Sequence, residues 1–203
     1  AEDAVLIDTA GRYTTQDSDG TADKASWTAF LETLKRGRPN QPINGVILSF
    51  SVADMMAHDA AALERHAQTV RARLSEIHEV LKIDFPVYVL FTKADLIAGF
   101  REYFSSFNVS RRKAVWGVTF QTRDRAAPTH TQVEAEFDRL VSRLSDEVVD
   151  RMSEEPDSVS RIAIFGLPSQ MALLRADIGE FLRKVFEPTR YKTNAILRGF
   201  YFT

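Results

Sequence analysis

Hydrophobic positions along the chain fall into two alternating patterns. Short runs in which nearly every residue is apolar predict buried strands, and longer stretches in which apolar residues recur every three or four positions predict helices packed by one face. The predicted strands are Ala4–Ile7, Gly45–Phe50, Val87–Phe91, Ala114–Phe120, Ile162–Phe165 and Leu197–Thr203. Strands that alternate with helices in this way are typical of an α/β domain whose mostly parallel sheet is covered on both faces.

The helical stretches lie between these strands. The longest pattern has apolar residues at 63, 67, 70, 74, 77 and 81, which form a single stripe. Three more helices are predicted through Trp27–Leu34, Phe100–Phe107 and Val133–Val148, and we expect the aromatic residues of the second to lie in the core. The stretch GLPSQ, residues 166–170, predicts the start of a last helix, with Pro168 near its first turn.

Composition narrows the class of protein. The 203 residues are 44% hydrophobic, enough for one large domain, and the net charge of -2 gives no basic excess for nucleic acid or an anionic membrane. The absence of cysteine excludes disulfides and cysteine-ligated metals, and it fits a cytosolic setting. No apolar run approaches the roughly 20 residues of a transmembrane helix, although a parent protein could still be membrane-bound.

Candidate chemistry begins directly after the first predicted strand, in the tetrad Asp8-Thr9-Ala10-Gly11. Ligands of parallel sheets bind beyond the carboxyl ends of the strands. A carboxylate at this position can hold magnesium through water, and a glycine amide can approach a phosphate without obstruction. A tight turn at the end of a strand is the structural alternative, and the tetrad alone does not separate the two.

A second tetrad, Thr92-Lys93-Ala94-Asp95, follows the strand Val87–Phe91. In GTPases a T-K-x-D sequence reads the base, because the carboxylate accepts two hydrogen bonds from guanine and the lysine stem covers the ring. The alternative is a helix N-cap by Asp95, and for this tetrad alone we favour the cap. The two tetrads together, in this order and at strand ends, favour a nucleotide-hydrolase-type fold. After Gly45–Phe50, a cap by Ser51 or Asp54 is the simpler interpretation.

The phosphate-binding loop of such a fold is not in this sequence. Its signature is G-x-x-x-x-G-K-[ST], and none of the nine glycines precedes a lysine. We therefore expect a P-loop-NTPase-like sheet that lacks the P-loop strand, with the chain a fragment that begins at the DTAG strand. We expect residues 1–192 to form this domain and residues 193–203 to start the following segment. No nucleotide is expected to bind to the fragment, and it should not hydrolyse one.

Two families combine DTAGR with T-K-x-D. In the signal-recognition-particle GTPases the second motif continues as TKxDG, whereas Leu96 follows Asp95 here. The chain more closely resembles the IcmF/TssM family, the large inner-membrane component of bacterial type VI secretion systems. The resemblance rests on AVLIDTAGRYTTQDS, GVILSFSVADMM, PVYVLFTKADLIAGFREYF and LRGFYFT, and it extends over essentially the whole chain.

The resemblance implies a cytoplasmic NTPase-like domain of a protein anchored in the bacterial inner membrane. It implies as partners a DotU/TssL-like inner-membrane protein, an outer-membrane lipoprotein and baseplate components, with magnesium and GTP or ATP as cofactors of the intact protein. By this resemblance Asp8 is the magnesium-side carboxylate and Gly11 the phosphate-sensing glycine, while Arg12 stands where many GTPases place a water-orienting glutamine. The base-side residues are Thr92, Lys93 and Asp95, and threonine in place of the commoner asparagine leaves the choice of base open.

The function expected on these grounds is a nucleotide-binding, nucleotide-hydrolysing or switching module that supports protein secretion. Two alternatives stay open. One is a scaffold that kept the NTPase fold without its catalysis and docks secretion partners. The other is a fragment of a signal-recognition-particle-like GTPase.

Overall fold

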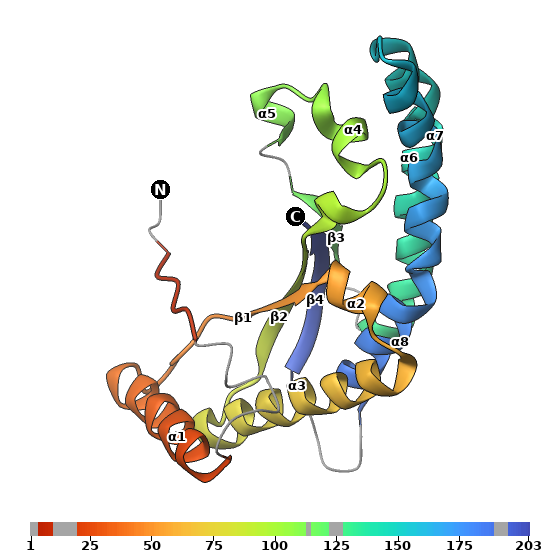
Figure 1. The fold of residues 1–203 in the computed structure, drawn as a ribbon. Helices are drawn as coiled ribbons and strands as arrows, with labels where there is room; N and C mark the ends of the chain where they lie inside the picture. Colours follow the sequence, from red (N-terminus) through yellow and green to blue (C-terminus); the bar gives the residue numbers. More distant parts are fainter. Residues whose placement is uncertain (1–3, 10–19, 113–114, 122–127, 189–194) are drawn as a thin grey trace.

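A computed structural model of the chain describes residues 4–9, 20–112, 115–121, 128–188 and 195–203 (Figure 1). In chain order the elements are α1 (Gly20–Gly37), β1 (Val46–Ser51), α2 (Val52–Ala57), α3 (Ala60–Leu81), β2 (Phe85–Thr92), the 3-10 helix η2 (Ala94–Leu96), α4 (Phe100–Ser105), α5 (Val109–Arg112), β3 (Trp116–Thr119), the 3-10 helix η3 (Thr129–Gln132), α6 (Val133–Glu154), α7 (Ser158–Leu173), α8 (Arg175–Phe186) and β4 (Ala195–Phe202).

The centre of the fold is a four-stranded sheet in the order β1-β2-β4-β3. Strands β1, β2 and β4 run parallel, and β3 runs antiparallel to β4. Parallel neighbours need long crossover connections, and the chain supplies them as α2 and α3 and as the stretch between β2 and β4. The expected α/β class, with a mostly parallel sheet flanked by helices, is confirmed. That the fold is of the P-loop type stays a prediction.

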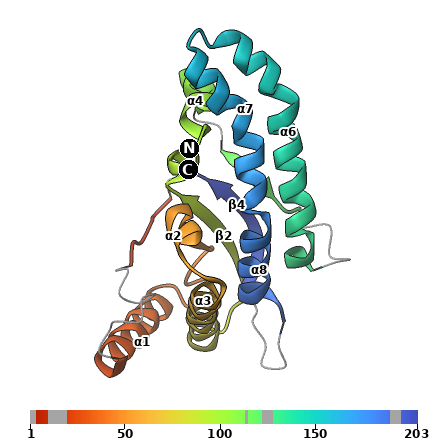
Figure 2. The ribbon, with the colours of Figure 1, turned by 45° about the vertical axis from the view of Figure 1, so that its right-hand side comes forward.

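One face of the sheet carries the core. Leu48, Phe50, Val89 and Phe200 are buried beneath α3, α6 and α8. Aromatic rings join these layers: Phe50 of β1 lies 4.7 Å from Phe181 of α8, centroid to centroid. Figure 2 shows α6, α7 and α8 standing together beside the sheet. The predicted helical stripes of α1, α3, α4 and α6 are confirmed as helices, and Tyr103 of the aromatic helix is fully buried.

The opposite face of the sheet is only partly covered by the described residues. Ile47 of β1 and Ile196 of β4 are exposed, and every second residue of β2 is half-buried. The expectation that helices cover both faces is therefore wrong for the described part of the chain. Parallel sheets in proteins are normally covered on both sides, so this face is unusual.

The predicted strand Ala4–Ile7 is also wrong. Residues 4–9 form an extended segment outside the sheet, on the side of β1, and Val5 is 89% exposed (Figure 1). Apolar character makes a segment a strand only where a neighbour pairs with its backbone, and no described strand pairs with this one. Among the described residues, β1 pairs with β2 alone, so its outer edge is open.

A third correction concerns Ile162–Phe165, for which the sequence predicts a strand, with a helix starting near Pro168. Both expectations are wrong, because α7 runs without a break from Ser158 to Leu173 and Pro168 lies inside it. The helix starts where Asp157 caps it: the Asp157 carboxylate accepts from the Ser160 backbone N–H at 2.8 Å. A four-residue apolar run has the same pattern in a strand and in a buried helix, so periodicity does not distinguish them.

Candidate functional site

The three parallel strands end together at one edge of the sheet. Ser51 and Thr92 are register partners there, and Thr203 follows the end of β4. Two backbone bonds hold Thr203 against β2: its N–H donates to the Phe91 carbonyl and its carbonyl accepts from the Ala94 N–H, both at 3.0 Å. The loop that carries the second tetrad is therefore tied to the strand beside it, at the edge where parallel sheets bind ligands.

The backbone at Lys93 adopts a conformation that non-glycine residues rarely take. Its φ of 59° and ψ of 33° lie in the left-handed region. Such a conformation costs about 1 kcal/mol or more, and residues held in it cluster at functional sites. The turn sends the chain directly into η2, with the Leu96 N–H donating to the Lys93 carbonyl at 3.1 Å. Lys93 itself is exposed.

Asp95 lies within η2 and not at its N-cap. The N-cap position belongs to Lys93, and no side chain caps this helix. The cap that we favoured for Asp95 from its tetrad alone is therefore wrong. The Asp95 carboxylate is exposed, and among the described residues it has no hydrogen bond or ion pair. Its oxygens are free to accept hydrogen bonds from a ligand.

The neighbouring polar residues have structural partners. Ser51 caps α2, accepting from the Asp54 N–H at 3.3 Å, and is thus one of the two caps between which the sequence left the choice open. The Thr92 hydroxyl donates to the Phe50 carbonyl of β1 at 3.5 Å, the long limit of a hydrogen bond. Thr92 thus faces the adjoining strand, and Asp95 is the more available of the two for a ligand.

Gly99 links this loop to α7. Its φ of 87° is left-handed, and a Cβ added there would lie 2.9 Å from the carbonyl carbon of Ala163 and closer still to its oxygen. Only glycine allows the backbone of the loop to approach the helix so closely. The loop between Thr92 and Gly99 is thereby fixed at one end by β4 and at the other by α7.

The phosphate-side residues are described only in part. Asp8 and Thr9 lie in the exposed segment 4–9, whereas Gly11 and Arg12 lie outside the described residues. No described group of three or more carboxylate, histidine or cysteine side chains could hold a metal. Magnesium in nucleotide sites uses one or two carboxylates and takes its other ligands from water and phosphate, and a single exposed carboxylate such as Asp8 fits that water-mediated role.

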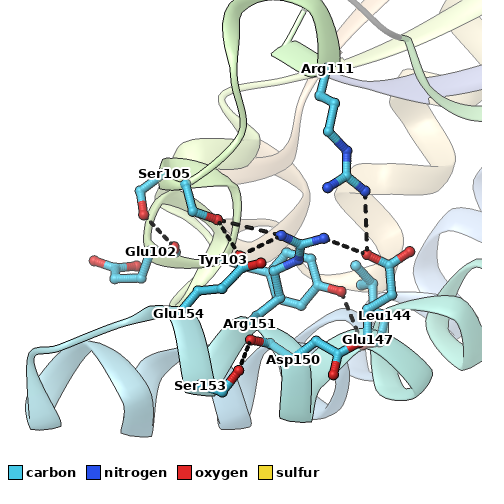
Figure 3. Close-up of polar contacts among 11 residues, drawn as sticks. Glu102, Tyr103, Ser105, Arg111, Leu144, Glu147, Asp150, Arg151, Ser153 and Glu154 are labelled. Carbon is cyan, nitrogen blue, oxygen red and sulfur yellow. Dashed lines mark hydrogen bonds and ion pairs between the residues drawn. The ribbon is translucent and has the colours of Figure 1, made fainter.

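Beyond the sheet edge, an ion-pair network fastens α4 and α5 to α6 (Figure 3). Arg151 of α6 is only 7% exposed, and it donates to Glu147 at 3.0 Å and to Glu154 at 2.9 Å. Its guanidinium also lies 4.7 Å from the Phe107 ring centroid. Burial by itself lowers the pKa of Arg151, but the hydrogen bond to Glu147 and the charges of Glu154 and Glu147 raise it above its ordinary value. Arg151 therefore stays charged.

Tyr103 joins the same network from α4. Its hydroxyl donates to the Leu144 carbonyl of α6 at 3.1 Å. Burial, and next the charge of Glu147, raise the pKa of Tyr103 to about 12. The aromatic residues that sequence spacing placed in the core therefore also include a polar anchor between two helices.

The raised pKa predicts an alkaline loss of stability. Above pH 10 an unfolded chain releases the Tyr103 proton while the folded chain keeps it, so stability is intact below pH 10 and falls as the pH rises toward 12, by roughly 2 kcal/mol. Urea unfolding at intervals from pH 8 to 11.5 measures this slope. Tyr103→Phe should flatten it while costing about 1 kcal/mol at pH 7 through the lost hydrogen bond. An unchanged slope in that variant would contradict the assignment.

Comparison with known proteins places the chain in a family. Residues 20–203 match the IcmF-related N-terminal domain. The chain belongs to the IcmF-related family. It is also 44% identical over 204 residues to the type VI secretion system component TssM1 of Pseudomonas aeruginosa, a match that covers all of this chain and 18% of that relative. No solved structure matches the chain.

Membership confirms the resemblance to the IcmF/TssM family. The chain spans 18% of the length of the curated relative, so the activity and partners of the whole protein are matters for proposal. In the described part of the chain, no helix is long and apolar enough to cross a membrane.

Sequence reasoning identified the tetrad loop but missed what holds it. Nothing in the sequence indicates the left-handed backbone at Lys93, because lysine is not a residue that favours this conformation. Gly99, four residues after Asp95, was the available signal for a close backbone approach. Arg151 gave no signal, because one arginine in a charged helix resembles any solvated residue.

Proposed function

We propose that this domain is a nucleotide-binding, nucleotide-hydrolysing or switching module that supports protein secretion by a type VI secretion system. The observation that carries the proposal is the loop at the carboxyl end of β2, where a left-handed Lys93 leaves the Asp95 carboxylate exposed and without a described partner. Membership of the IcmF-related family and the similarity to TssM1 support the secretion role.

In this proposal the loop holds the base. The Asp95 carboxylate accepts the N1–H and exocyclic amine of guanine, and the Lys93 stem covers the ring and sugar. Adenine lacks that pair of donors, so Asp95 favours GTP over ATP. Thr92 is turned toward the Phe50 carbonyl, which leaves recognition mainly to Asp95.

In this proposal the phosphates of the nucleotide are bound by Asp8, Gly11 and Arg12, together with a phosphate loop that this sequence does not contain. Bound magnesium would neutralise charge on the phosphate oxygens during transfer of the terminal phosphoryl group to water. Asp8 would hold that ion through water, Gly11 would sense the terminal phosphate, and Arg12 would contact phosphate in place of a water-orienting side chain. The open outer edge of β1 and the partly covered sheet face leave space for a further strand and helix, which supports a phosphate loop supplied from outside residues 1–203.

The family also supports a setting for this module. We propose that the parent protein is anchored in the bacterial inner membrane and that this domain faces the cytoplasm. There it would meet a DotU/TssL-like inner-membrane protein and baseplate components, while an outer-membrane lipoprotein would meet other parts of the parent.

A non-catalytic scaffold is the second candidate. It is favoured by the apolar surface that the described residues leave exposed. The third candidate, a signal-recognition-particle-like GTPase, is disfavoured by Leu96 after Asp95 and by the family match.

Nucleotide binding by the full-length protein tests the proposal. We expect magnesium-dependent binding of GTP by calorimetry, and we expect Asp95→Asn to weaken it at least tenfold while relatively favouring xanthosine triphosphate, because the amide reverses one hydrogen bond. Asp146→Asn is the matched control: Asp146 is an exposed aspartate on α6, away from the loop, and this change should leave binding unaltered.

Two results would decide against parts of the proposal. If the full-length protein binds neither GTP nor ATP with magnesium, the scaffold function replaces it. If GTP binds but Asp95→Asn behaves like Asp146→Asn, the nucleotide does not use the tetrad loop. Residues 1–203 alone should show no hydrolysis in either case.

A further inference from the structure

Helix α7 is apolar on both sides, although only one side has a partner among the described residues. Ile164, Leu167 and Met171 are buried against the rest of the protein. On the outer side Val159, Ile162, Phe165 and Leu173 are 71%, 72%, 67% and 72% exposed. A helix that is apolar all round is normally buried all round, so this outer stripe is an unfilled contact surface.

Gly166 lies in the middle of the stripe without an explanation inside the described chain. A glycine in a helix interior costs about 0.5–1 kcal/mol relative to alanine. A Cβ added at Gly166 would meet nothing within 4 Å, and its backbone is helical rather than left-handed. Neither packing nor conformation within the described residues requires glycine here. Glycine on an apolar helix face allows the backbone of another helix to approach closely.

We propose that the occupant of this stripe is α7 of a second copy of the chain, packed antiparallel. The central line of this stripe runs Ile162, Gly166, Ser169 and Leu173, with steps of four, three and four residues. This order, large-small-small-large, reads the same in both directions. A two-fold axis between Gly166 and Ser169 therefore sets Gly166 against Ser169 of the second copy and Ile162 against its Leu173, which is the self-complementarity that a symmetric dimer needs.

Charge permits this pairing. Arg161 is the one charged residue in the sequence of α7, and its guanidinium bonds to the backbone carbonyls of Glu155 and Pro156. Two copies of the uncharged stripe can thus meet without like charges facing one another. A charged or strongly polar partner would gain nothing from this surface.

The area suits a weak dimer. Covering four side chains that are about seven-tenths exposed removes on the order of 500 Å² from each copy, or about 1,000 Å² in total, at the lower limit of specific interfaces. We therefore expect association with a dissociation constant on the order of 100 μM. The proposal does not depend on nucleotide binding.

Sedimentation velocity on residues 1–203, over a concentration series centred on about 100 μM, tests it. The unmodified chain should shift from monomer to dimer. Ile162→Glu and Leu173→Lys, each alone, should weaken association at least tenfold, because each change enters the dimer twice. Val149→Glu, an equally exposed apolar position on α6, is the matched control and should dimerise normally.

Mixing the two charged variants tests the register. In the mixed dimer the carboxylate introduced by Ile162→Glu on one chain faces the ammonium group introduced by Leu173→Lys on the other, while the unaltered Leu173 of the first chain faces the unaltered Ile162 of the second. The mixture should therefore recover dimerisation that neither variant shows alone. Circular dichroism should be unchanged throughout, since the substituted side chains are exposed.

Disulfide trapping tests the geometry of the dimer separately. The sequence contains no cysteine, so any cross-link must form between the introduced residues. An equimolar mixture of Gly166→Cys and Ser169→Cys should cross-link under mild oxidation, and Ser145→Cys, an exposed serine on α6, should not. A chain that stays monomeric at millimolar concentration overturns the proposal, as does a charged mixture that fails to recover. Monomer that instead binds neutral phosphatidylcholine vesicles through Ile162 would assign the stripe to lipid and overturn it equally.

Discussion

Replacing Gly99 by alanine is expected to lower the free energy of unfolding by about 3 kcal/mol or more. Two costs add at this position. Holding a side-chain-bearing residue at φ 87° costs about 1–2 kcal/mol, and the new methyl group overlaps the Ala163 carbonyl of α7, where backbone must move to admit it. Urea unfolding followed by circular dichroism measures the loss.

Gly166→Ala is the matched control for Gly99→Ala. It adds the same methyl group to a glycine whose surroundings are open, so it should raise the stability of the monomer by about 0.5–1 kcal/mol. If both variants change stability in the same direction, the close approach of the loop to α7 is not as described.

Removing both carboxylates from Arg151 is expected to cost more than removing the arginine. Glu147→Gln with Glu154→Gln leaves a buried guanidinium without an opposite charge from these residues, and we expect a loss of about 3 kcal/mol. Arg151→Met fills a similar volume and leaves two carboxylates that are half exposed and can be hydrated, so its cost should be about 1 kcal/mol.

The triple variant completes this thermodynamic cycle. With methionine at 151, the two glutamines no longer leave a buried charge, and most of the loss seen in the double variant should return. Thermal unfolding of the four proteins at pH 7 gives the coupling energy. Equal losses of stability in the Arg151→Met and double-glutamine variants would mean that neutralising a buried charge is not how the network stabilises the fold.

Much of the fold was predictable because burial imposes strong periodicity. The stripe of α3 has one interpretation, because apolar residues spaced three and four apart over so long a stretch share one face only in a helix. A cap by Ser51 or Asp54 was equally predictable, because a hydroxyl directly after a strand and before a helix has a local purpose.

The failures have a common physical cause, which is that the deciding partner is remote in sequence. Ile162–Phe165 is apolar whether it is a strand or part of α7, and the packing of α7 against α6 decides between the two. Ala4–Ile7 has the pattern of a strand but no described neighbour to pair with. For the candidate site, the sequence placed Asp95 just beyond the end of a strand, where the structure has it in η2, yet the conformation of Lys93 and the contact at Gly99 depend on tertiary structure.

The position of β4 has a consequence for how the domain folds. This strand is the last element in sequence, yet it lies between β2 and β3, and among the described strands β3 has no other partner. A ribosome therefore releases β1, β2 and all the described helices before the middle of the sheet can form. Pairing strands that lie so far apart in sequence costs chain entropy before any contact forms, and this cost makes the pairing slow. Folding should accordingly be limited by the insertion of β4, and until then β2 exposes an unpaired edge on which chaperones or neighbouring chains can act.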